Sequence, residues 1–180
     1  MKHFIYILLL VLFISRCQPK EEKSFIQFPG MPEVPLSIKK DHEYLLDQIH
    51  KITLFQDSAG NVAIKLNELM QHHFKEEEEF VLPPLGLLTS LASGKMPEQS
   101  SRVIQLTDKI SSQLTHLNAE HQFIRAYMDE LKKADPIGSH PEILVLEKEL
   151  HQHANLEEEV LFPAAILIGE YLKLKVTIKP

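Results

Sequence analysis

The chain has 180 residues, of which 44% are hydrophobic and 24% are charged, and this length and composition predict about one globular domain. Its formal net charge of −6 provides no basic surface for phosphate backbones, so we expect no nucleic-acid partner. The single cysteine excludes an intrachain disulfide and a thiolate metal cluster. Ten histidines are the unusual feature, and they leave nitrogen and oxygen as the ligands for a metal such as iron, manganese or zinc.

The first 17 residues have the features of an export signal. Lys2 precedes an apolar run from Phe4 to Ile14, which is shorter than the roughly 20 residues that a membrane-spanning helix needs. Cys17 follows this run and is itself followed by polar residues, as in bacterial lipoprotein signals, whose cysteine becomes lipidated. Arg16 departs from that pattern, because a small residue usually precedes the cysteine. We therefore expect an exported protein on the periplasmic or cell-surface side, anchored to the membrane through a lipid on Cys17; the alternative is a short uncleaved anchor.

Four helices are predicted between residues 38 and 170, after a proline-rich tether over residues 18–37. Apolar residues recur in each of them at steps of three and four, which is the helical period. The helices are expected over 38–56, from about 62 to the Pro83-Pro84 pair with a short turn over 85–92, from about 103 to 134, and from about 139 to Gly169, with a tail over 171–180. No segment supplies the alternating strands of a sheet, so the predicted fold class is all-α, as an up-down-up-down four-helix bundle.

A motif on the second predicted helix returns on the fourth. HFKEEEEFVLPPL begins at His73 and HANLEEEVLFPAA begins at His153, and in both a Glu follows the His by four residues and a Pro by ten. Residues four apart lie on one face of a helix, so each copy aims an imidazole and a carboxylate at one point. The two pairs, His73 with Glu77 and His153 with Glu157, are therefore candidate metal ligands.

The repeat extends to the first and third predicted helices. His42 and His121 each follow an acidic residue, and their distances along the chain to His73 and His153 differ by one residue. A hairpin with a lone His on its first helix and His-x-x-x-Glu on its second is thus used twice. The other glutamates of the two acidic runs, Glu78 and Glu158 among them, are expected to face solvent. The full set of candidate ligands is His42, His73, Glu77, His121, His153 and Glu157.

These motifs resemble the hemerythrin-like, or HHE cation-binding, domain family over about residues 38–170. Members of that family have a His on the first helix, H-x-x-x-E on the second, E-H on the third and H-x-x-x-E on the fourth, and the six candidate ligands occupy those places. The resemblance implies a four-helix bundle with a non-haem di-iron centre. It also implies that Glu77 and Glu157 bridge the two irons and that the four histidines are terminal ligands.

The chain departs from the oxygen-carrying hemerythrins, which have a His-x-x-x-His pair on the third helix. Arg125 and Leu117 stand four residues to either side of His121, where a fifth histidine is expected in a carrier. His116 is five residues from His121 and lies on another side of that helix. Four further histidines are expected at the surface or away from a compact site: His50, His72, His140 and His151.

Without a fifth histidine, an octahedral ion keeps an open position. The expected function is therefore the binding, sensing or handling of O2, NO or iron, with peroxide as a further small ligand. Two alternatives stay open: a di-iron redox enzyme of the peroxidase, nitric-oxide-reducing or iron–sulfur-repair type, and a metal-storage or structural bundle. Export weighs against iron–sulfur repair, because such clusters are assembled in the cytosol.

A Cys17→Ser variant tests the lipid anchor. The substitution removes the thiol that lipidation needs, so the protein should move from the membrane fraction to the soluble exported fraction. Cell fractionation, followed by detection of the protein in each fraction, measures the shift. A variant that stays with the membrane would favour the uncleaved anchor and contradict lipidation.

Overall fold

A computed structural model describes residues 30–177, and every regular element in that range is a helix. The all-α prediction is therefore confirmed. Two π-helical turns, η1 and η3, and one 3-10 turn, η2, accompany the α-helices. In chain order the elements are α1 (Leu36–Thr53), α2 (Ser58–Glu76), η1 (Glu77–Val81), η2 (Pro83–Leu87), α3 (Leu88–Ala92), α4 (Ser100–Ala134), α5 (Pro141–Leu156), η3 (Glu157–Leu161) and α6 (Phe162–Thr177).

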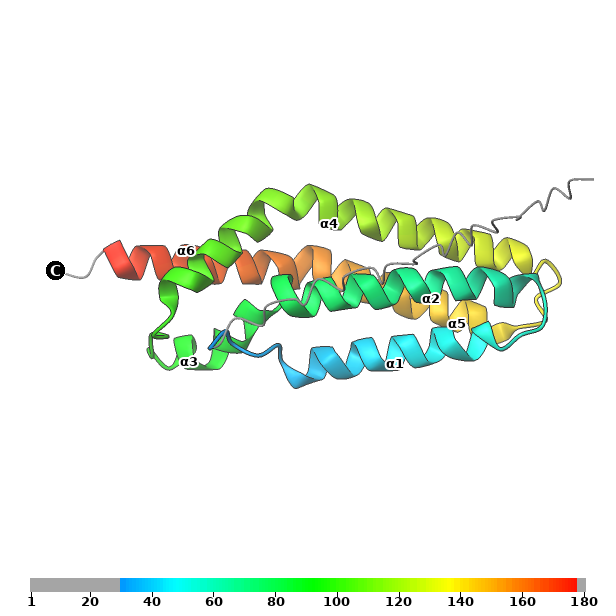
Figure 1. The fold of residues 1–180 in the computed structure, drawn as a ribbon, viewed down its shortest axis with the longest axis horizontal. Helices are drawn as coiled ribbons and strands as arrows, with labels where there is room; N and C mark the ends of the chain where they lie inside the picture. The colour runs from blue at the N-terminus through cyan, green and yellow to red at the C-terminus, as the bar shows by residue number, and fades with distance from the viewer. Residues whose placement is uncertain (1–29, 178–180) are drawn as a thin grey trace, which may run out of the picture.

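The long helical segments lie side by side, and the chain direction alternates from one to the next (Figure 1). α1 runs in one direction and α2 with η1 returns; α4 runs out again, and α5 continues through η3 into α6 on the way back. α1 packs on α2 and α5, while α4 packs on α2 and α6. η2 and the short α3 connect the second segment to the third at one end of the molecule.

Two apolar clusters fill the interior, with a polar zone between them. The residues that border this zone are Phe74, Ile124 and Leu150 in the first cluster and Val81, Leu117 and Phe162 in the second. Between these borders along the chain lie the buried residues Glu77 of η1, His121 of α4, His153 of α5 and Glu157 of η3. The polar side chains are thus enclosed by apolar layers on both sides and are kept from bulk water.

The two acidic runs form the π-helical turns. In η1 the Leu82 amide donates to the Glu77 carbonyl at 2.8 Å, and in η3 the Phe162 amide donates to the Glu157 carbonyl. These bonds span five residues instead of four, so each turn holds an extra residue compared with an α-helix. Such turns occur frequently at functional sites, and here both begin at a candidate ligand.

The fourth helical segment is longer than predicted. α6 continues through Gly169 to Thr177, so most of the expected tail over 171–180 is helical, and residues 178–180 lie outside the described range. Gly169 lets α6 approach α4 closely, because a Cβ at this position would lie 1.8 Å from Thr107 Oγ1. Leu172 is fully buried and holds the next turn against the core. Gly169 resembles a helix stop in the sequence, but in the structure it is the point at which α6 contacts α4.

The other helix boundaries agree with the predicted ranges to within a few residues. α1 begins at Leu36, after the described end of the tether, where Val34 is buried in the second cluster. α2 begins at Ser58 because the Asp57 carboxylate caps it, accepting the Gly60 amide at 3.0 Å.

Residues 1–29 lie outside the described range, and with them the predicted export signal, Cys17 and most of the tether. Between residues 30 and 177, no helix combines the length and the apolar composition that crossing a bilayer requires. The expected lipid anchor therefore stays a prediction.

Candidate metal centre

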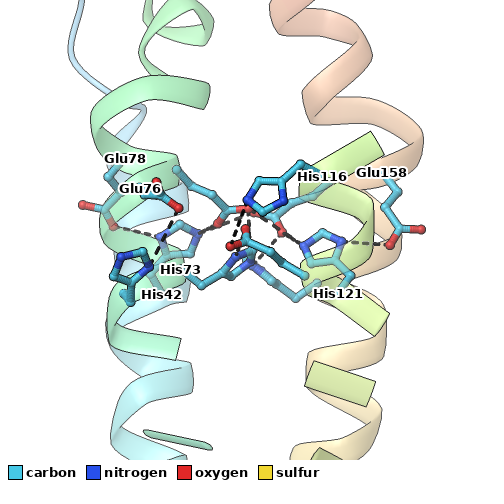
Figure 2. Close-up of polar contacts among 12 residues, drawn as sticks. His42, His73, Glu76, Glu78, His116, His121 and Glu158 are labelled. Carbon is cyan, nitrogen blue, oxygen red and sulfur yellow. Dashed lines mark hydrogen bonds and ion pairs between the residues drawn. The ribbon is translucent and has the colours of Figure 1, made fainter. Parts of the chain in front are cut away.

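All six predicted ligands are buried and come together in the polar zone between the two apolar clusters. They come from separate segments: His42 from α1, His73 from α2, Glu77 from η1, His121 from α4, His153 from α5 and Glu157 from η3. Figure 2 shows three of them, His42, His73 and His121, around one space between the helices. Both glutamates have an exposed fraction of 0%. The repeat in the sequence thus becomes a single internal site.

The six side chains form two overlapping groups of potential metal ligands. The first is His42, Glu77, His153 and Glu157, and the second is His73, Glu77, His121 and Glu157. Within each group, one ligand atom per residue lies within 4.8 Å of all the others. Both glutamates belong to both groups, so the two groups share their carboxylates. We call the two groups the His42–His153 subsite and the His73–His121 subsite.

The Nε2 atoms of the histidines face the oxygens of the two glutamates. His73 Nε2 lies 3.2 Å from Glu77 Oε1, and His153 Nε2 lies 3.1 Å from Glu157 Oε2, as the four-residue spacing predicts. Across the site, His121 Nε2 lies 3.3 Å from Glu157 Oε2. Nitrogen and oxygen donors from different helices therefore share one enclosed space.

Within residues 30–177, none of these facing atoms has a hydrogen-bond partner. This holds for Nε2 of all four histidines and for both oxygens of each glutamate. A buried polar atom without a partner costs about 1–3 kcal/mol, and more when it is charged, so eight such atoms in one cluster would strongly destabilise the interior. Bound metal would give these atoms partners, and these donors suit a first-row transition metal. The residues present therefore fit a metal centre.

Two further carboxylates hold the outer nitrogens of the lone histidines. His42 Nδ1 lies 2.8 Å from Glu78 Oε1, and His121 Nδ1 lies 2.8 Å from Glu158 Oε1. In Figure 2 these two glutamates lie on opposite sides of the site. A carboxylate on Nδ1 makes that nitrogen the donor and leaves the Nε2 lone pair for a metal.

The acidic residue before each lone histidine contacts a histidine of the other hairpin. Asp41 Oδ2 lies 2.8 Å from His153 Nδ1, and Glu120 Oε2 lies 3.3 Å from His73 Nδ1. Every one of the four imidazoles thus has a carboxylate behind it. Two of these contacts lie within a hairpin and two connect the hairpins, so the outer carboxylates orient the ligands and join the two halves.

The prediction that Glu78 and Glu158 face solvent holds only in part, because their side chains are 31% and 24% exposed and each also contacts a histidine. Each follows a buried glutamate and directs its carboxylate to a histidine on a neighbouring helix. A signal was present in the repeat, because the two residues occupy the same place in both copies. Which glutamate of an acidic run turns inward depends on the π-helical turn, and the helical period does not reveal such a turn.

No other described histidine reaches the centre. His116 is exposed, and its Nε2 lies 3.8 Å from Glu120 Oε1, on the outer side of the carboxylate that holds His73. Leu117 is buried in the second apolar cluster, and Arg125 donates to Glu158 Oε1 at 3.0 Å. The remaining histidines lie outside both subsites: His50, His72, His140 and His151.

The two buried glutamates repel each other with little solvent to screen them. Burial and the charge of Glu157 raise the pKa of Glu77 well above its usual value. Burial alone would also raise the pKa of Glu157, but the imidazoles of His121 and His153 lower it well below its usual value. Without a metal, the pair therefore favours one proton and one negative charge.

The fold and the site together define a helical metal-binding domain. The family model of the hemerythrin HHE cation binding domain matches residues 36–165, a range that includes all six ligand positions. The chain belongs to this family, and the resemblance in the sequence is confirmed. In comparisons with curated proteins and with solved structures, none matches the chain.

The pH dependence of stability tests the contact between Asp41 and His153 in protein freed of metal by a chelator. Burial alone would lower the pKa of His153, but Asp41 and Glu157 raise it to about 9. An unfolded histidine has a pKa of about 6.5, so the folded protein binds this proton more tightly. The stabilisation is present in full below about pH 6.5 and is lost as the pH rises through about 9. The melting temperature should therefore fall across this range.

An Asp41→Asn variant should show a smaller fall in melting temperature, because protonated His153 loses a charged partner. Asp47→Asn is the matched control, since it removes an exposed carboxylate from the same helix, where Asp47 binds Lys51. Thermal unfolding of both variants between about pH 6.5 and pH 9 gives the comparison. Equal slopes in the two variants would show that Asp41 does not hold the His153 proton.

Proposed function

We propose that this chain binds two non-haem iron ions, with Glu77 and Glu157 as bridging carboxylates. His42 and His153 are then the terminal ligands of one ion, and the other two histidines are those of the second. The observation that carries the proposal is that two groups of ligand atoms share both glutamates. A single ion would use only one group, and it would leave two buried imidazoles with unpaired nitrogens.

The donor set supports iron over the other candidates. Imidazole suits iron and zinc better than manganese, whereas carboxylates suit manganese and magnesium, so a mixed set favours iron. Helical bundles in which glutamates and histidines from facing helices bind a pair of ions are known for iron and manganese. Membership in a cation-binding family supports metal binding independently of this chemistry.

We infer further that the long segments form an up-down-up-down four-helix bundle around the centre. Support comes from the alternating chain direction in Figure 1 and from the packing of α1 on α2 and α5 and of α4 on α2 and α6. Cofactor sites of such bundles are built from side chains on facing helices. Because each segment contributes one histidine, the bound ions join all four of them.

Bound iron supplies redox chemistry and affinity for small ligands such as O2, NO or peroxide. The protein's own residues orient the ligands and exclude water. Phe74 stacks on the His42 ring with 4.0 Å between the ring centroids, and Phe162 lies 5.8 Å from the His121 ring. Two histidines and two shared carboxylates do not fill an octahedral ion. This supports a protein that binds, senses or handles a small diatomic molecule or iron.

Metal analysis of the purified chain, produced with ample iron, should give two irons per molecule. Glu77→Ala and Glu157→Ala should each release metal and lower the melting temperature, because both ions lose a bridging carboxylate. Glu76→Ala is the matched control from the same acidic run, since Glu76 pairs only loosely with the exposed His72. Stoichiometric zinc, or protein without metal, would contradict the proposal.

The response to oxygen separates sensing or turnover from reversible carriage. Arg125 binds Glu158 and Leu117 lies in the apolar cluster, so neither position supplies a further ligand. Both irons then stay open, and oxygen added to the anaerobic, reduced protein should oxidise the centre irreversibly. Visible absorption before and after evacuation measures this. A spectrum that returns to its starting state under vacuum would mean reversible carriage and contradict this expectation.

A further inference from the structure

We propose that the two subsites are unequal, and that Arg125 makes the His73–His121 subsite the weaker one, so that the His42–His153 subsite binds its ion first. This inference rests on the proposed two-ion centre. Arg125 contacts no ligand atom that faces the centre; it acts through Glu158 on His121. It is therefore a positioning residue whose charge reaches the ion through two contacts.

The first observation is that Glu158 Oε1 accepts from two donors. His121 Nδ1 lies 2.8 Å from this oxygen, and Arg125 Nη2 lies 3.0 Å from it. Arg125 also donates to Asn155 Oδ1 at 3.4 Å, which helps to hold the guanidinium beside the carboxylate. The side chains of Arg125 and Glu158 are 23% and 24% exposed, so solvent screens this pair only in part.

The shared oxygen weakens His121 as a metal ligand. A carboxylate behind an imidazole raises its basicity, because it attracts the Nδ1 proton. A guanidinium on the same oxygen draws negative charge away from that contact, so His121 gains less. The guanidinium also places a fixed positive charge near the ion, and this opposes cation binding. Both effects lower the affinity of the His73–His121 subsite.

The matching position in the first hairpin carries no charge. Four residues after the lone histidine, the first hairpin has Leu46 where the second has Arg125. Leu46 packs against the first apolar cluster and cannot donate to Glu78. His42 Nδ1 keeps its 2.8 Å contact with Glu78 Oε1. The two hairpins thus have the same types of ligand. They differ in the residue that lies next to the outer carboxylate.

The second pair of outer contacts differs in the same direction. His153 Nδ1 lies 2.8 Å from Asp41, whereas His73 Nδ1 lies 3.3 Å from Glu120. The His42–His153 subsite therefore has two short contacts behind its histidines. The His73–His121 subsite has one longer contact and one that is shared with Arg125. Both differences indicate weaker metal binding at the His73–His121 subsite.

Anaerobic calorimetric titration of the metal-free full chain with ferrous ions measures the two binding steps. Arg125→Leu, which copies the residue of the first hairpin, should tighten the weaker step on the order of tenfold, the scale on which outer partners change metal affinity. The tighter step should stay unchanged. Arg125→Lys keeps a positive charge near Glu158 and should restore much of the wild-type difference.

Two sets of variants complete the experiment. Lys173→Leu is the matched control for charge, because Lys173 binds Asp108 and Glu170 outside the centre, and it should leave both steps unchanged. The ligand variants assign the steps: His42→Ala should abolish the tighter step, and His121→Ala should abolish only the weaker one.

The proposal is overturned if Arg125→Leu shifts both steps equally or shifts neither. A lower melting temperature with unchanged binding steps would show that Arg125 only connects α4 to α5, which also overturns it. Loss of the tighter step in His121→Ala would reverse the assignment and do the same. Wild-type protein that binds no ferrous ion, or only one, would instead refute the two-ion function and this inference with it.

Discussion

The buried pair of carboxylates at Glu77 and Glu157 is the constraint on which the rest of the structure depends. An unpaired carboxylate in a protein interior costs several kcal/mol, and here two of them share a space that apolar layers enclose on both sides. A strongly charged partner has to offset this cost, and the Nε2 atoms around the pair favour a metal cation over a lysine or an arginine. The helices, the π-helical turns and the outer carboxylates all serve to place that partner.

The outer carboxylates change the charge of the centre as a whole. Six carboxylates lie in the centre or next to it: Asp41, Glu77, Glu78, Glu120, Glu157 and Glu158. With the two divalent cations proposed above, four positive charges and a fifth from Arg125 would bring the centre close to neutral, whereas the metal-free centre is strongly negative unless it takes up protons. Burial and then the neighbouring carboxylates raise the pKa of Glu77, whereas burial lowers the pKa of His153 and the carboxylates of Asp41 and Glu157 raise it. Metal binding therefore has to release protons, which couples it to pH.

The six candidate ligands could be found in the sequence because repetition makes a common pair specific. His73 with Glu77 alone occurs easily in a chain this rich in both residue types, but the same spacing in a second hairpin, with a lone histidine before each copy, does not. The sequence could not show how each helix is rotated about its axis. Glu78 and Glu158 differ from their neighbours only in direction, and the π-helical turns set that direction. Gly169 likewise resembles a stop because its contact across to α4 is invisible in a linear pattern.

The two copies of the internal repeat have the same candidate ligands. They differ in the residues around the outer carboxylates that contact those ligands. A changed ligand would leave buried atoms unpaired, so both hairpins keep the same donors. At the outer carboxylates, solvent begins to reach the side chains, with Glu78 31% exposed and Glu158 24% exposed, and a changed neighbour costs less there. The chain can therefore carry Leu46 in one hairpin and Arg125 in the other without losing the fold. Because the two proposed ions would receive the same ligand types, a difference between them would have to come from this outer layer, where charge acts on the metal through the histidine that it contacts.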